Sequence, residues 1–276
     1  MTTKNYKPHI FALSALFTLG NTIITLSGLS VCEAILLPGV LMITLLVSTG
    51  LKSVAHKNPR VAFLINIMVG VAALYGAVTA IFDYALFLKE QQSPQIGIWL
   101  MTIILAVVVV SFVACKKSAV YKYSLFAFFV VVAIIALCFV SGIKNFDLNN
   151  IKGFFNTNLS NTNVYLKIMI PMFVLPFFIS EGTCQKMVFL GVLSGAFVLF
   201  AVTLQTLLTL GEAFDTPFAY LKAVGIISVG SLFTRLDGLV WFVFFVTAII
   251  RGIICAKIAV YSVKLSVVDI YKQKSL

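Results

Sequence analysis

Charged residues are scarce in this sequence. Only 11% of its 276 residues are Asp, Glu, Lys or Arg, whereas a soluble domain usually carries about 25%. Hydrophobic residues make up 61% of the chain, and the mean hydropathy is +1.09. A chain with so little polar surface cannot cover a fold in water, but this composition is what lipid-facing helices require. The composition therefore excludes an ordinary soluble domain and predicts a membrane protein.

Residues typical of metal and catalytic sites are also few. Histidine occurs only at His9 and His56, and the five cysteines lie far apart with no Cys-x-x-Cys pair. Zinc centres and Ser-His-Asp sites need such residues in clusters, so we expect no metal, no cofactor and no enzymatic activity. The net charge of +11 is spread between apolar runs. Because no basic stripe with interleaved aromatic residues is present, we expect no nucleic-acid partner.

Apolar runs long enough to cross a bilayer recur along the chain. A spanning helix needs about 20 largely apolar residues. By this measure the sequence predicts eight spans, near residues 10–30, 31–51, 61–88, 96–115, 120–141, 165–181, 186–211 and 236–260. We therefore expect an all-α polytopic bundle in contact with membrane lipid, forming a single transmembrane domain over residues 1–276.

Two segments between the predicted spans have a different character. Residues 142–164 are rich in Asn and also contain Gly and Lys, which is typical of an extracytoplasmic loop. Residues 212–235 are moderately apolar and include Thr216-Pro217. This pattern predicts an interfacial helix or a re-entrant segment within the domain.

The distribution of positive charge predicts the orientation of the chain. With a cytoplasmic N-terminus, the outer segments hold only Lys89, Lys144, Lys152, Lys167, Lys222 and Arg235, and most of the other Lys and Arg residues fall inside. The positive-inside rule then predicts that both termini are cytoplasmic. One arginine, Arg251, lies within the last span, and we expect its long stem to snorkel to the cytoplasmic interface.

Helix breakers interrupt two of the predicted spans. The first contains Leu19-Gly20-Asn21-Thr22 about halfway along, and the sixth contains Pro171 and Pro176, followed by Phe177-Phe178-Ile179-Ser180-Glu181. Broken helices expose backbone groups that can bind a ligand at the membrane midplane. Glycine also permits close helix packing, and proline produces plain kinks. Both interpretations remain open from these residues alone.

Three further charges lie at or inside the predicted spans. Asp83, beside Tyr84 in the third span, is a candidate for a proton or ligand role, or is a hydrogen-bonded interior carboxyl. Arg235 and Asp237 lie two residues apart at the outer start of the last span. They are candidates either for a functional role or for anchoring and pairing with loop charges.

Four stretches, in order, resemble one family. They are LFTLGNTIITLSGL at 16–29, KNFDLNNIKGFF at 144–155, LPFFISEG at 175–182 and FTRLDGLVWFVFFVTAIIR at 233–251. Together they resemble the B subunit of GerA-type spore germinant receptors, the endospore germination permeases, which belong to the amino acid–polyamine–organocation transporters. The resemblance implies a LeuT-like inverted-repeat bundle. Family members usually have ten helices, so this chain would be a shortened form.

The resemblance also implies a function and a site. It implies a membrane subunit, in the cell membrane or spore inner membrane, that senses an amino acid and relays the signal to A-type and C-type partner subunits. The alternatives are a secondary amino-acid transporter and a reduced, non-binding scaffold. The ligand carboxylate would sit at freed N–H groups of the first helix. The implied ligand-binding residues are Gly20, Asn21, Thr22, Phe177, Phe178, Ser180 and Glu181.

Overall fold

The structure is a computed structural model of the whole chain. It describes residues 7–20, 23, 31–57, 59–91, 97–150, 162–179, 185–211, 218–227 and 236–274. Their helices are α1 (Lys7–Leu19), α3 (Val31–Lys57), α4 (Pro59–Gln91), α5 (Ile98–Val113), α6 (Lys117–Gly142), the 3-10 turn η3 (Ile143–Asn145), α7 (Thr162–Phe178), α8 (Gln185–Leu210), α9 (Ala219–Gly225) and α10 (Asp237–Lys274). No strand occurs among these residues, so the predicted all-α class is confirmed.

A helix lies at each of the eight predicted spans, although α1 covers only the first half of the first one. Within the described part of the chain, five helical segments are long and apolar enough to cross a membrane: Leu36–Ala55, Val61–Gln91, Lys117–Asn145, Gln185–Leu210 and Asp237–Leu265. Two shorter apolar helices, Ile98–Val113 and Leu166–Phe178, accompany them. These helices support a membrane-embedded protein, while the count of eight spans stays a prediction.

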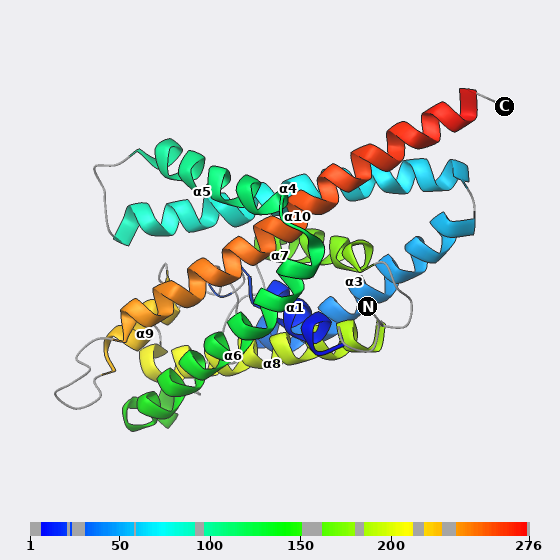
Figure 1. Ribbon diagram of the computed structural model, residues 1–276. Coiled ribbons are helices and arrows are strands. Elements are labelled where there is room, and N and C mark those ends of the chain that lie inside the picture. The colour runs from blue at the N-terminus through cyan, green and yellow to red at the C-terminus, as the bar shows by residue number, and fades with distance from the viewer. Residues whose placement is uncertain are drawn as a thin grey trace.

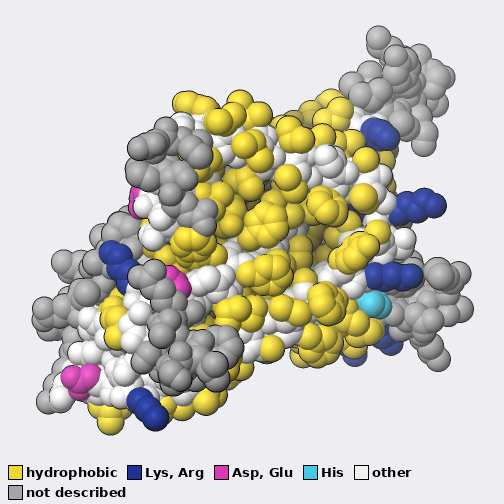
Figure 2. All heavy atoms as spheres, turned by 60° about the vertical axis from the view of Figure 1, so that its left-hand side comes forward, with side chains coloured by type: hydrophobic (Ala, Val, Ile, Leu, Met, Phe, Trp, Pro, Cys, Tyr) yellow, Lys and Arg dark blue, Asp and Glu magenta, His cyan; other side chains and the backbone are white. Residues whose placement is uncertain are grey.

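The surface of the bundle matches this environment. Figure 2 shows a broad hydrophobic surface between two ends, with Lys or Arg side chains at both ends and Asp or Glu side chains at the left-hand one. Large apolar side chains such as Leu64, Val71, Phe126 and Phe197 are more than 60% exposed. So much apolar surface is unfavourable in water. Lipid tails cover it without this cost.

The two longest helices, α4 and α10, form the most extensive contact of the bundle. They run antiparallel, since Gly70 lies against Ser262 and Gly76 against Cys255. A Cβ at Gly76 would lie only 2.9 Å from the Cys255 sulfur. Small residues allow this close approach, which supplies the van der Waals contact that holds helices together in lipid.

The short helix α1 lies in the middle of the bundle (Figure 1). Its residues from Ala12 to Leu19 are all buried. It runs parallel to α8, because Gly191 faces Ser14 and Gly195 faces Thr18. The α1–α8 pair is the second most extensive helix contact of the fold. A helix so completely enclosed contributes packing rather than lipid-facing surface.

The first turn of α1 and the part of α10 around Tyr261 lie at the same end of the bundle, next to the start of α6. His9 Nδ1 is 3.1 Å from the Tyr121 carbonyl oxygen at the start of α6. Lys117, also at the start of α6, places its ammonium 5.2 Å from the centre of the Tyr261 ring on α10. This end is called the terminal end below. Which side of the membrane it faces stays a prediction.

The described parts of the two segments outside the predicted spans lie at the opposite end, called the loop end below. In the predicted loop 142–164, the described part reaches residue 150, and the Asp147 N–H and the Asn150 side chain both donate to the Leu208 carbonyl at 3.0 Å. In the segment 212–235, residues 219–225 form α9 beside the start of α10 (Figure 1). Five of its seven residues are buried, so α9 packs into the bundle.

The α1–α8 contact predicts a packing defect. A Cβ at Gly195 would lie 2.7 Å from the Ala15 carbonyl oxygen and 2.8 Å from Thr18 Cβ. We expect Gly195→Ala to lower the free energy of unfolding by roughly 1–3 kcal/mol, the usual cost of overpacking. Gly50→Ala is the matched control, because nothing lies within 4 Å of the added methyl. Thermal unfolding in detergent measures both, and equal melting temperatures would contradict the packing described.

Candidate functional site

The structure describes half of the predicted site residues. Asn21, Thr22, Ser180, Glu181 and Arg235 lie outside the described residues. The described ones are Gly20, Phe177, Phe178, Asp83 and Asp237. Gly20 contacts Arg251, and Asp83 is joined to Arg251 through Lys167. The other three lie elsewhere in the bundle.

Gly20 directly follows the last residue of α1 and lies against the side chain of Arg251. Its N–H donates to the Leu16 carbonyl at 2.9 Å, which closes the last turn of the helix. A Cβ at Gly20 would lie 2.6 Å from Arg251 Cδ and 3.2 Å from Arg251 Nη1. The Thr247 hydroxyl lies 3.3 Å from the Gly20 carbonyl oxygen. The glycine is therefore required by the close passage of the Arg251 stem over the end of α1.

Arg251 itself corrects a prediction. It does not snorkel to the interface, since it is 3% exposed and lies inside the bundle. The side chain is held inside by its contacts with α1 and α7. The guanidinium donates from Nη2 to the Lys167 carbonyl at 2.6 Å, and its carbon lies 5.8 Å from the Phe17 ring centre.

The end of α1 suits a buried cation. The last carbonyls of a helix lack intrahelical partners and carry a partial negative charge. Arg251 lies beside this end and beside an aromatic face, which both favour a positive charge. Its Nε atom, however, is buried and has no hydrogen-bond partner among the described residues. Within the described part of the chain, the guanidinium therefore retains one buried donor without a partner.

Asp83 pairs with a lysine from another helix. Lys167 Nζ on α7 lies 3.0 Å from Asp83 Oδ1 on α4. The Asp83 side chain is 7% exposed and that of Lys167 is 38% exposed. The predicted interior carboxyl is thus hydrogen-bonded, and a proton or ligand role for it stays a prediction. Lys167, counted among the outer charges by sequence, contacts Asp83 with its side chain and Arg251 with its carbonyl oxygen.

Phe178 lies at the terminal end of the bundle. Its ring contacts the Tyr121 ring at 5.8 Å between centres, and the Lys117 ammonium lies 5.1 Å from its centre. Tyr121 in turn contacts His9. Because Gly20 follows His9 by 11 residues, about 16 Å of helix, the described residues do not bring Phe178 and Gly20 together. Phe177 contacts Phe173 of its own helix, with ring centres 6.1 Å apart.

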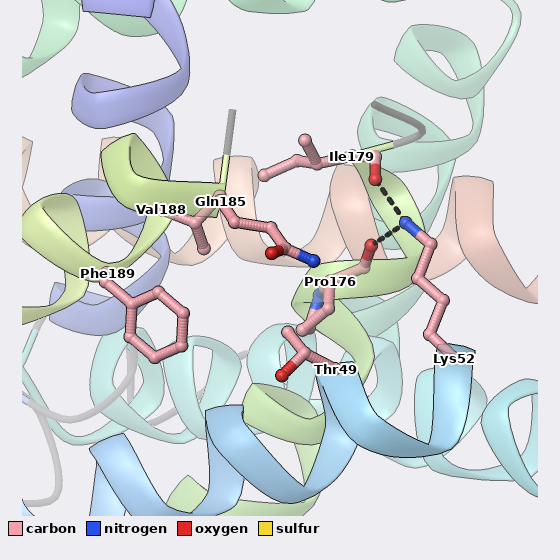
Figure 3. A pocket seen from close by; sticks show the side chains of 7 residues that line it. All are labelled: Thr49, Lys52, Pro176, Ile179, Gln185, Val188 and Phe189. Carbon is pink, nitrogen blue, oxygen red and sulfur yellow. Dashed lines mark hydrogen bonds between the residues drawn. The ribbon is translucent and has the colours of Figure 1, made fainter. Parts of the chain in front are cut away.

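A lysine holds the end of α7. Lys52 Nζ on α3 donates to the Pro176 carbonyl at 2.7 Å and to the Ile179 carbonyl at 2.5 Å (Figure 3). Its ammonium thereby replaces the backbone N–H donors that the last carbonyls of a helix lack. The adjoining pocket, which Thr49, Gln185, Val188 and Phe189 also line, has a volume of about 20 Å³. That is room for about one water molecule and not for an amino acid.

Asp237 has a local role at the start of α10. Its Oδ1 accepts the Gly238 N–H at 3.1 Å in the first helical turn. A carboxylate at this position interacts favourably with the N-terminal end of the helix dipole. Both the functional role and the anchoring role of Asp237 stay predictions.

Comparison with known proteins finds no matching family model, no similar curated protein and no similar solved structure.

The contact of Lys52 with α7 predicts a local change in protection. In Lys52→Met the Pro176 and Ile179 carbonyls lose their cationic donor, so we expect the last turn of α7 to open more often. Hydrogen exchange should become faster around residues 174–179 by about one order of magnitude or more. Lys57→Met, an exposed position at the end of α3, is the matched control. Unchanged exchange in Lys52→Met would contradict the capping role.

The Asp83–Lys167 pair predicts a measurable coupling. A double-mutant cycle of Asp83→Asn and Lys167→Met is expected to give a coupling free energy of about 1 kcal/mol, reduced because Lys167 is partly exposed. Asp83→Asn with Lys222→Met is the control pair, because Lys222 is exposed on α9. Thermal unfolding measures both cycles. Strictly additive effects of Asp83→Asn and Lys167→Met would show that the ion pair contributes nothing.

Proposed function

We propose that this chain is a membrane subunit of a spore germinant receptor, which senses a small molecule such as an amino acid and relays the signal to partner subunits. The resemblance of its four sequence stretches to the B subunits of GerA-type receptors suggested this function. The observation that carries it is the end of α1 at Gly20 beside the buried Arg251.

The charges around this place favour an anionic group on the ligand. A buried ionised group is costly unless it is paired. Among the described residues, the cations Arg251 and Lys167 are accompanied only by the carboxylate of Asp83. A ligand carboxylate would offset the remaining positive charge and would accept a hydrogen bond from Arg251 Nε. This differs from the arrangement expected by resemblance, in which the carboxylate meets only backbone N–H groups.

The same place is suited to relaying a signal. Helix α7 is held to α4 by the Asp83–Lys167 pair and to α3 by Lys52. A ligand changes a conformational equilibrium only when it binds two states unequally. A ligand that competes for Asp83 or Arg251 alters the contacts of α7 and α10, and thereby favours one arrangement of these helices. The proposal includes A-type and C-type partner subunits, a cell-membrane or spore-inner-membrane location, and cytoplasmic termini.

One observation favours a second candidate, a non-binding scaffold subunit. The Arg251 stem already fills the space beside Gly20, which supplies a packing reason for the glycine. In a scaffold the buried charges would only fix the positions of α4, α7 and α10. Ligand binding separates the two candidates.

The test is the thermal stability of the detergent-purified chain with a panel of amino acids. A ligand that binds only the folded state stabilises it, by about 2.7 kcal/mol at 100 times Kd. We expect a saturable rise in melting temperature with at least one amino acid. Gly20→Trp should abolish it, since an indole cannot fit beside Arg251, while Gly50→Trp on the exposed face of α3 should retain it. A folded, monodisperse protein that no amino acid stabilises would favour the scaffold.

A further inference from the structure

The ion pair and the buried arginine share one residue. Lys167 gives its ammonium to Asp83 and its carbonyl oxygen to Arg251. We propose that Asp83 and Arg251 recognise the ammonium and the carboxylate of a zwitterionic amino acid, and that Lys167 is an internal competitor that occupies Asp83 until the ligand displaces it. This inference rests on the proposed sensing function and adds the recognition chemistry and its regulation.

Arg251 has the free capacity that a carboxylate needs. A guanidinium presents five N–H donors in a planar fork that matches a carboxylate. Among the described residues, Nη2 donates to the Lys167 carbonyl at 2.6 Å. The buried Nε has no hydrogen-bond partner among the described residues. The Arg251 side chain stays charged in proteins, and the residue is only 3% exposed. A carboxylate from a ligand is therefore the complementary group.

Asp83 already binds an ammonium group, which is the second charged group of the proposed ligand. The Lys167 ammonium, 3.0 Å from Asp83 Oδ1, is a primary ammonium like that of an amino acid. The Asp83 carboxylate is nearly fully buried, whereas the Lys167 side chain is 38% exposed. The acceptor is therefore fixed inside the bundle, while its present cation sits on a flexible stem that can leave. This asymmetry is what an internal, displaceable competitor requires.

Once displaced from Asp83, the Lys167 ammonium can reach the interface at the loop end. It is five residues from Thr162 at the start of α7, which is about 8 Å of helix. A lysine stem can cover most of that distance and place its ammonium at the interface. Asp83 lies eight residues from Gln91 at the end of α4, about 12 Å inside the same loop end. A ligand arriving from the loop end would therefore meet Lys167 before the buried Asp83.

Displacement also changes what holds the helices. With Lys167 on Asp83, α7 is tied to α4 by an ion pair. A zwitterion that takes Asp83 breaks this tie and places its own two charges between α4 and α10. The two buried charges are then balanced, because the ligand ammonium pairs with Asp83 and the ligand carboxylate pairs with Arg251, while Lys167 reaches water. Binding is thus coupled to the release of α7.

The first part of the test uses the unaltered protein. Melting temperatures are measured with the proteinogenic amino acids, β-alanine and γ-aminobutyrate, and then with the amine-only and acid-only analogues of the most stabilising compound. We expect only molecules with both charges to stabilise the chain. Equal stabilisation by an analogue that lacks either charge would overturn the two-group recognition, without touching the sensing function itself.

The second part removes the competitor. We expect Lys167→Met to bind the same compound with a Kd about tenfold lower, as when a minor competent state becomes the main one, and Lys167→Arg to remain near the unaltered protein. Asp83→Asn and Arg251→Lys should raise Kd at least about tenfold. Lys222→Met, exposed at the same end, is the control for a lost surface charge.

The outcomes separate this inference from the proposed function. Binding by the unaltered chain with the same Kd in Lys167→Met, Asp83→Asn and Arg251→Lys overturns the inference and leaves the sensing function standing. No binding by the unaltered chain or by Lys167→Met overturns both. Tighter binding by Lys167→Met, together with loss in Asp83→Asn, supports the inference.

Discussion

The burial of one guanidinium constrains the centre of this bundle. Arg251 lies in the apolar interior, where an uncompensated charge costs several kcal/mol. Its compensation comes from three other helices: the end of α1 at Gly20, the Lys167 carbonyl on α7 and, through Lys167, the Asp83 carboxylate on α4. The close approach at Gly20 and the pairing of Asp83 with Lys167 both surround this cation.

Around this centre, packing and capping follow from the surrounding lipid. Lipid tails are as apolar as the side chains, so helices associate through close contact, as at the glycines between α1 and α8 and between α4 and α10. The carbonyl groups at helix ends need donors, and lysines supply them at two helices. Lys52 caps the end of α7, and Lys257 donates to the Val113 carbonyl at 2.8 Å and to that of Cys115 at the end of α5. The lysines at the terminal end thus have structural partners in addition to any role in orientation.

The candidate site could be predicted only in part. Glycine in a span and a carboxylate in apolar surroundings are visible in sequence, so Gly20 and Asp83 were identifiable. Arg251 was visible too, but the predicted snorkelling was wrong, because the side chain contacts the end of α1 and the Lys167 carbonyl on α7, and one helix alone does not show these contacts. Lys167 was counted as a loop charge, and no local pattern shows that it reaches Asp83 across 84 positions of sequence. Phe177 and Phe178 lie at the terminal end, away from Gly20.

Composition and apolar run length determined the class, the helices and their approximate bounds, because a chain in lipid must satisfy its backbone within helices of bilayer length. The tertiary structure alone decided which helices meet. Helix α1 is enclosed beside α8, α9 is packed into the loop end, and three helices bring Asp83, Lys167 and Arg251 together. These contacts depend on side-chain shape and charge pairing between residues distant in sequence, which the periodicity and hydropathy of a single helix do not encode.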